Sequence, residues 1–108
     1  MISENTIHEA VDRLVKVANP AKVILFGSYA TGNATVNSDL DLMVIEPNIT
    51  ELTSENKAVL RNAIGDVGAG VDLLVYTEEE VRRRGQVPGT VIYWALKEGR
   101  VMYESSTH

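Results

Sequence analysis

Apolar residues recur along the chain with two different periods, and each period predicts one type of element. The N-terminal part has the period of an amphipathic helix that ends before Pro20. Its apolar positions are Ile7, Val11, Leu14, Val15 and Ala18. Thr6 and Glu9 have the spacing of a capping box, which makes Thr6 the expected N-cap. The chain therefore opens with a helix that buries one face.

Three mainly apolar runs predict strands. They are Lys22–Phe26, Leu40–Ile45 and Val71–Tyr76. The first run ends at Gly27, where we expect the chain to turn. The third contains Asp72, and a charge inside such a run costs free energy unless it is paired or bound to a metal. We therefore expect this strand to lie beside the other two, with Asp72 facing Asp39 and Asp41.

Helical patterns lie between and after these strands. Residues 57–64 predict a helix. Its expected inner positions are Val59, Leu60, Ala63 and Ile64. Thr77 and Glu80 form a second capping box, which opens a short charged helix that ends near Gly85.

The C-terminal part predicts one more helix and one more strand. Pro88 precedes a helix from Thr90 to Glu98, and Gly99 separates it from a candidate edge strand at residues 100–103. This edge would permit pairing with a second copy, or it would cap the domain by itself. The order of elements predicts an α/β (α+β) fold, a small mixed sheet with helices packed mainly on one face.

Length and charge limit the classes of function. At 108 residues the chain is expected to form one domain, residues 1–108, burying about two thirds of its unfolded surface. The net charge of −5 disfavours a long nucleic acid as substrate, because proteins that grip one usually have a basic surface. Without cysteine, disulfides and thiolate metal sites are excluded. No signal peptide or membrane span is visible, so we expect a cytoplasmic protein.

Polar chemistry is concentrated between the first two predicted strands. Gly27 and Ser28 form a turn directly after a strand, a suitable place to bind phosphate. Asp39 and Asp41 are two residues apart, so both side chains point to one face, roughly 7 Å apart along the backbone. Such carboxylates repel each other unless a cation lies between them, and oxygen ligands favour Mg²⁺ or Mn²⁺. Asp72 offers a third carboxylate.

This arrangement resembles the minimal nucleotidyltransferases of the DNA polymerase β superfamily. The family pattern is Gly-Ser, three residues, Gly, five residues, Ser-Asp, one residue and Asp-Leu. The chain fills the pattern without a gap, with Gly27, Ser28, Gly32, Ser38, Asp39, Asp41 and Leu42. The aspartate in a following strand and the C-terminal run at residues 96–104 also resemble small members, so the resemblance covers nearly the whole chain.

The resemblance implies a nucleotidyltransferase fold and transfer of AMP from ATP to a hydroxyl. Two Mg²⁺ ions about 4 Å apart, with Mn²⁺ as a substitute, would be held by Asp39, Asp41 and Asp72. Asp72 would complete the coordination of the ion that activates the acceptor hydroxyl. Gly27 and Ser28 would bind the β- and γ-phosphates together with amides of the following helix.

The same resemblance implies a partner. Stand-alone members resemble antitoxins paired with HEPN-domain toxins, whose tyrosine they adenylylate. A HEPN-domain protein is therefore the expected acceptor. Ser38 belongs to the expected nucleotide site as a turn residue that orients Asp39, since no His or Lys lies nearby in sequence to activate its hydroxyl.

Other residues have competing interpretations. Residues 82–84, all arginine, could reach a triphosphate, although after three glutamates a solvated helix face is the commoner outcome. Tyr93 and Trp94 could stack on a nucleobase, although aromatic residues of a short amphipathic helix usually belong to the core.

Two other functions stay open beside protein adenylylation. The fold could serve as a binding module that covers its partner, and Thr31 favours this alternative because many relatives carry Arg in that turn. An intact set of three aspartates argues against it, because a relic has no reason to keep charges that repel one another. The chain could also modify a hydroxyl of a small molecule, with the acceptor pocket supplied by a homodimer.

Overall fold

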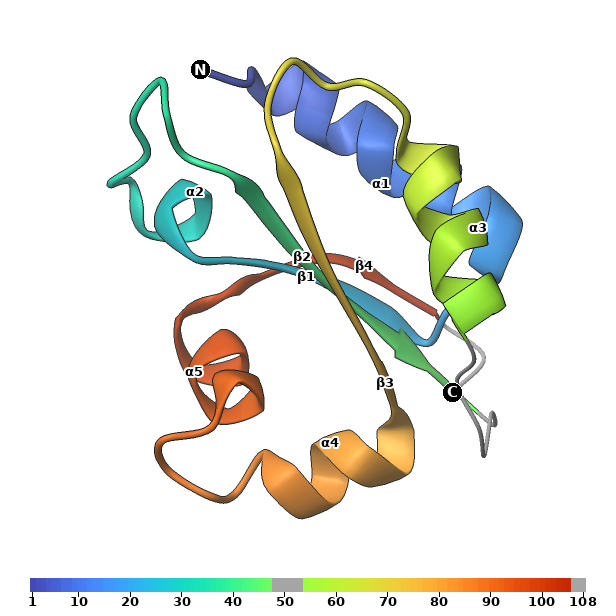
Figure 1. Cartoon of the computed structure of the whole chain (residues 1–108). Helices are drawn as coiled ribbons and strands as arrows, with labels where there is room; N and C mark the ends of the chain where they lie inside the picture. Colours follow the sequence, from blue (N-terminus) through green and yellow to red (C-terminus); the bar gives the residue numbers. More distant parts are fainter. Residues whose placement is uncertain (48–53, 106–108) are drawn as a thin grey trace.

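A mixed four-stranded sheet with the order β3-β2-β1-β4 lies at the centre of the computed structural model, which describes residues 1–47 and 54–105 (Figure 1). The strands are β1 (Lys22–Phe26), β2 (Leu40–Glu46), β3 (Val71–Thr77) and β4 (Arg100–Glu104). β1 is antiparallel to β2 and to β4, whereas β2 and β3 are parallel. The predicted α+β class and the mixed sheet are confirmed.

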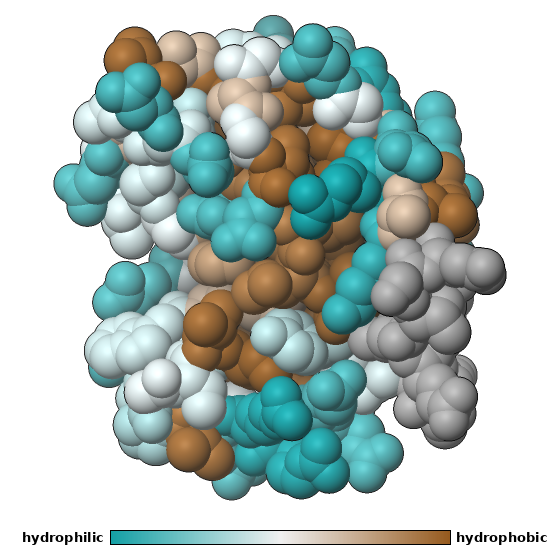
Figure 2. Space-filling model, viewed as in Figure 1, coloured by the Kyte–Doolittle hydropathy of each residue, from teal (hydrophilic) through white to brown (hydrophobic). Residues whose placement is uncertain are grey.

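Helices cover both faces of the sheet, to different extents. They are α1 (Glu4–Ala18), α2 (Ser28–Thr31), α3 (Ser54–Ile64), α4 (Glu78–Arg84) and α5 (Val91–Glu98). The two longest, α1 and α3, lie side by side on one face, as the prediction of one main layer requires (Figure 1). α4 and α5 form a second, smaller layer on the opposite face. Figure 2 shows apolar surface in the middle of the view, between the two layers.

Alternation along β2 builds a separate core on each face. Leu40, Leu42 and Val44 belong to the larger apolar cluster, which also contains Leu14 of α1. Met43 and Ile45 point to the other face and belong to the smaller cluster, which α5 completes. This smaller cluster consists of the buried residues Ile24, Met43, Ile45, Ile92 and Ala95. Because side chains alternate along a strand, Asp41 shares the face of Met43 and Ile45.

The first helix begins earlier than the capping box predicted. Ser3 is the N-cap, and its Oγ accepts a hydrogen bond from the amide of Thr6 at 3.2 Å. Thr6 therefore lies inside the first turn, and Glu9 forms an ion pair with Arg13 at 3.7 Å. The predicted capping box of Thr6 and Glu9 is wrong because the cap is already formed three residues upstream.

The second capping box is confirmed. The amide of Glu80 donates to Thr77 Oγ1 at 3.1 Å, and the amide of Thr77 donates to Glu80 Oε1 at 3.2 Å. In α3, Leu60 and Ile64 are buried as expected, but Val59 is 54% exposed and does not belong to the inner side. Trp94 is 46% exposed, so its assignment to the core is also wrong.

The predicted edge strand at the C-terminal end is confirmed as β4, which among the described residues pairs with β1 alone. Its register shifts between Val23 and Ile24, which marks a bulge near Met102. Such bulges disturb the regular spacing of an edge. Within the described ranges, no helix has both the length and the apolar character needed to cross a membrane.

Candidate active site

Three aspartates meet at one end of the β2–β3 pair. Asp41 lies directly opposite Asp72 in the parallel register, which confirms that the third apolar run lies beside the second. Asp39 comes just before β2, and the next amide, that of Leu40, donates to the carbonyl of Gly70 at 2.8 Å. The strands thus place Asp72 opposite Asp41, from which it is separated by 31 positions in the chain. Asp39 and Asp72 are exposed, whereas Asp41 is half-buried.

The three carboxylates influence one another electrostatically. The pKa of the Asp41 carboxyl is raised to about 6, first by burial and then by the negative charges of Asp72 and Asp39. A divalent cation would relieve this repulsion, and a set of oxygen donors suits Mg²⁺ or Mn²⁺. Within residues 1–47 and 54–105, no three side chains of His, Cys, Asp or Glu are already gathered as ligands of one metal ion. The donor chemistry therefore fits a divalent metal.

The turn after β1 is built against the central aspartate. Gly27 has a φ of +74° and a ψ of −154°, a conformation that favours glycine. A Cβ at this position would overlap the carboxylate of Asp41. The carbonyl of Gly27 accepts hydrogen bonds from the amides of Ala30 and Thr31, at 3.1 and 3.2 Å. The amides of Ser28 and Tyr29 therefore begin α2 without a preceding helical carbonyl, and could serve an anion.

Two hydroxyls of the motif stabilise loops. Thr31 Oγ1 donates to the carbonyl of Gly27 at 3.3 Å and accepts from Asn33 Nδ2 at 3.1 Å, so Thr31 closes the turn around α2. Ser38 Oγ accepts from the amide of Thr35 at 2.8 Å, and the amide of Ser38 donates to the carbonyl of Thr35 at 3.0 Å. The loop that leads to Asp39 is thus closed by Ser38.

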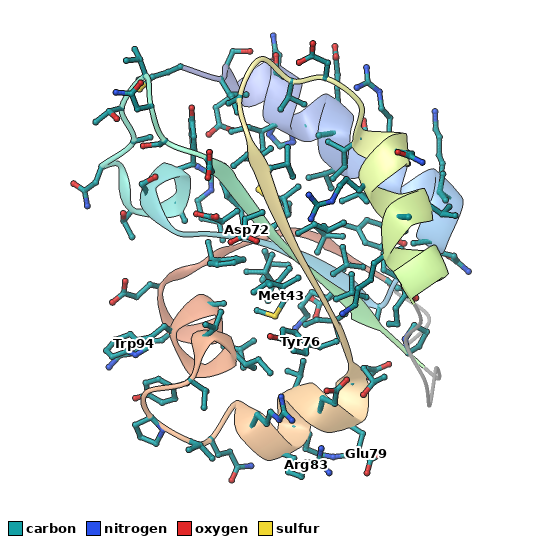
Figure 3. The ribbon with its side chains drawn as sticks, in the orientation of Figure 1. Met43, Asp72, Tyr76, Glu79, Arg83 and Trp94 are labelled. Atoms are coloured by element: carbon teal, nitrogen blue, oxygen red, sulfur yellow. The ribbon has the colours of Figure 1, made fainter. Side chains whose placement is uncertain are left out.

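Arginines and aromatic residues singled out in the sequence lie elsewhere. α4 follows β3 at the end opposite Asp72, about 16 Å away by strand rise, and Figure 3 shows Arg83 there. Trp94 projects outward from α5, away from Asp72 (Figure 3). It meets Tyr93 edge-on at 5.3 Å between ring centroids, and Lys97 Nζ lies 5.4 Å from its ring. Neither Arg83 nor Trp94 points toward Asp72 (Figure 3).

One residue of this site was missed in the sequence. Gly70 immediately precedes β3, and its missing side chain leaves space for the carboxylate of Asp39. The signal that could have identified it is its position two residues before Asp72, which repeats the spacing of Asp39 and Asp41.

Family comparison agrees with this geometry. Residues 4–92 match the model of the nucleotidyltransferase domain family. The chain belongs to this family. The matched range includes α2, the loop to Asp39 and all three aspartates.

Relatives of known sequence match this nucleotidyltransferase domain over part of their length. Caffeine-induced protein 16 of Schizosaccharomyces pombe is 32% identical over 77 residues, which is 66% of this chain. A candidate protein adenylyltransferase of Methanocaldococcus jannaschii is 45% identical over 42 residues, which is 39% of this chain. The matches span only 6% and 29% of these two proteins, respectively.

Solved structures share the fold of the nucleotidyltransferase domain. A candidate nucleotidyltransferase from Sulfolobus solfataricus has a TM-score of 0.64 at 20% identity, over 93% of this chain and 78% of that one. A toxin–antitoxin complex solved with AMP-PNP has a TM-score of 0.63 at 19% identity, over 93% and 75%. The complex MntA-HpeT, carrying two aspartate-to-glutamate substitutions, has a TM-score of 0.60 at 16% identity, also over 93% and 75%.

Proposed function

We propose that this nucleotidyltransferase domain transfers AMP from ATP to a hydroxyl of a partner protein and acts in the cytoplasm as an antitoxin. The acceptor in this proposal is a tyrosine of a HEPN-domain toxin. The observation that carries it is the meeting of Asp39, Asp41 and Asp72 directly beside the turn at Gly27. Carboxylates beside a phosphate-binding turn are the groups that nucleotidyl transfer needs.

Each residue has a function in this reaction. Asp39, Asp41 and Asp72 would hold two Mg²⁺ ions, which when bound neutralise charge on the triphosphate and lower the pKa of the acceptor hydroxyl. Gly27 allows the β- and γ-phosphates to approach the backbone, while the Ser28 hydroxyl and the first amides of α2 donate hydrogen bonds to them.

The reaction balances without another reactant. The acceptor oxygen attacks the α-phosphorus and forms a new phosphoester bond, while the bond to the bridging oxygen breaks and pyrophosphate leaves. Asp72 is exposed, so an arriving hydroxyl can reach its carboxylate, which would take the proton in this proposal. Asp41 is half-buried beside Gly27 and is better placed to serve the nucleotide side.

Names of relatives support the choice of acceptor. One sequence relative is a candidate protein adenylyltransferase, and two of the structural neighbours are toxin–antitoxin complexes, one of them solved with AMP-PNP. These names favour a protein acceptor over a small molecule. Thr31 is the feature that favours a purely binding antitoxin, and its hydrogen bonds to the turn show that the residue also has a structural task.

Transfer of label from α-³²P-ATP tests the proposal. The wild type, Asp72→Asn and the control Glu79→Gln, which lies on α4 far from the site, are each incubated with Mg²⁺ and the protein encoded beside this chain. We expect the wild type and Glu79→Gln to label the partner and Asp72→Asn to label it at least a hundredfold more slowly. A stable complex without label would refute the proposal in favour of the binding module. Transfer to a small hydroxyl compound in the absence of any partner would refute the protein acceptor.

A further inference from the structure

Four positions on one face of the sheet form two short rows. Asp41 and Asp72 are register partners in β2 and β3. The preceding row holds Asp39 and Gly70, because Leu40 pairs with Val71 and the parallel register continues one residue back. Three of these four positions carry a carboxylate, and the fourth has no side chain.

The carboxylate of Asp39 occupies the space that a side chain at Gly70 would need. A Cβ built on Gly70 would lie 2.5 Å from Asp39 Oδ1 and 3.1 Å from Asp39 Cγ. The distance of 2.5 Å to Oδ1 is too short for unbonded atoms and that of 3.1 Å to Cγ is unusually tight, so one group would have to move. The side chain of Asp39 is exposed on its outer side and can rotate away from β3. Its backbone is held more firmly, because the neighbouring residues are hydrogen-bonded: Leu40 to Gly70, and Ser38 to Thr35.

Backbone conformation does not explain the glycine at this position. Gly70 is absent from the glycines with positive φ, so an alanine could adopt its backbone without strain. Gly68 is the opposite case in the same loop. Its φ is +85°, and nothing lies within 4 Å of a Cβ built there. Gly68 is therefore required by the backbone, and Gly70 by the neighbouring carboxylate.

We propose that Gly70 is a positioning residue, whose missing side chain allows the Asp39 carboxylate to lean toward β3 and share a divalent cation with Asp41 and Asp72. This inference rests on the proposed function, because it assigns Asp39 to a metal centre. An added methyl group turns Asp39 outward and removes one ligand while the sheet stays folded. Gly70 thus affects metal binding through Asp39 alone.

Titration with Mn²⁺, in which calorimetry measures the binding, tests this inference on the complete chain. We expect Gly70→Ala to bind Mn²⁺ at least tenfold more weakly than the wild type, with a metal-free Tm unchanged within a few degrees. The matched control Gly68→Ala should show the reverse pattern, a lower Tm and an unchanged Mn²⁺ affinity, because its strain is in the backbone. In an Asp39→Ala background, Gly70→Ala should cause no further loss of affinity.

Several results would overturn the inference. Wild-type Mn²⁺ affinity in Gly70→Ala would do so, as would an equal loss of affinity in the Asp39→Ala background. A Tm reduced as strongly as in Gly68→Ala would make Gly70 a residue of the fold. Mn²⁺ binding by a wild type that transfers no nucleotide would refute the proposed function and leave the inference on Gly70 standing, whereas a wild type that binds no Mn²⁺ would refute both.

Discussion

The two faces of the sheet use the same strands for different purposes. On one face, β1, β2 and β3 are covered by α1 and α3, and fourteen buried residues form one cluster. On the other, the smaller layer of α4 and α5 contributes to a cluster of five buried residues. The aspartates lie on this second face, beyond the part that α5 covers. The smaller layer leaves one end of the sheet accessible to a substrate.

Neighbouring residues of β2 show what this difference means. Leu40 and Leu42 are completely buried under the larger layer, while Asp41 between them is only half-buried. The strand is therefore fixed by apolar packing on one side and presents its charge on the other. Burial of the flanking leucines holds the Asp41 backbone in place, and this rigidity positions a site more accurately than a loop would.

Asp41→Asn, on the accessible face of the sheet, should have the largest effect. It should lower activity and leave the fold intact. Removing the charge of the central carboxylate should lower the rate of nucleotidyl transfer at least a thousandfold, about 4 kcal/mol of transition-state stabilisation. Label transfer from α-³²P-ATP measures this rate. Circular dichroism and thermal unfolding should show an intact fold, and retention of a tenth of the activity would contradict the assignment.

Leu42→Ala should act on the opposite face and should lower stability instead. Leu42 is 0% exposed, so its truncation leaves a cavity under α1 and should cost about 3 kcal/mol. Urea unfolding monitored by circular dichroism gives this value. The matched control is Met43→Leu, a change of shape at a completely buried position on the other face, which should cost less than about 1.5 kcal/mol. A loss below 1 kcal/mol for Leu42→Ala would show that the larger layer is loosely packed.

Asp41→Asn should also have a smaller effect, on the stability of the metal-free protein, and this effect should depend on pH. The folded-state pKa of Asp41 is about 6 against an ordinary value of 3.8, so the folded state holds this proton more tightly than the unfolded state does. The resulting stabilisation is complete below pH 3.8 and is lost as the pH rises through 6. At pH 8, Asp41→Asn should therefore be more stable than the wild type, by about 1 kcal/mol after solvent screening is considered.

Urea unfolding of both proteins in EDTA, at pH 5 and pH 8, measures this difference. Titrating groups that do not interact with Asp41 cancel when the variant is subtracted from the wild type, and the repulsion by Asp39 and Asp72 is part of the effect measured. A difference that grows toward low pH would have the wrong sign and would contradict the raised pKa. Saturating Mg²⁺ should reverse the order of stability at pH 8, because only the wild type keeps the complete set of ligands.

Sequence alone predicted those parts of the fold that depend on local pattern. Three of the strands followed from mainly apolar runs, and the proximity of Asp72 to Asp41 followed from a charge inside such a run. The capping box at Thr77 was found because its two hydrogen bonds join residues three apart. These features are encoded within a few residues and need no tertiary information.

The features that were missed depend on competition between neighbouring caps or on contacts between distant segments. Ser3 and Thr6 are both suitable N-cap residues, and the spacing of Thr6 and Glu9 does not show which of them forms the cap. Val59 matches the helical period but lies outside the contact between α3 and α1. The position of Gly70 two residues before Asp72 marks it as a candidate, but its contact with Asp39 follows only once β3 lies beside the residue before β2.

The smallest effect is expected on the outer side of the smaller layer. Trp94 is 46% exposed and its contacts are an edge-on ring and a cation over its face, which together contribute about 1 kcal/mol at an exposed site. Alanine has a higher helix propensity than tryptophan, which stabilises the helix by about 0.5 kcal/mol and offsets part of this loss. Trp94→Ala should therefore change stability by no more than about 0.5 kcal/mol. Ile92 lies on the same helix with 2% exposure, and Ile92→Ala should cost about 3 kcal/mol. Urea unfolding compares the two variants. A loss above 1.5 kcal/mol for Trp94→Ala would mean that its ring is part of the packed layer, and the contrast between the two faces would then be smaller than these exposures indicate.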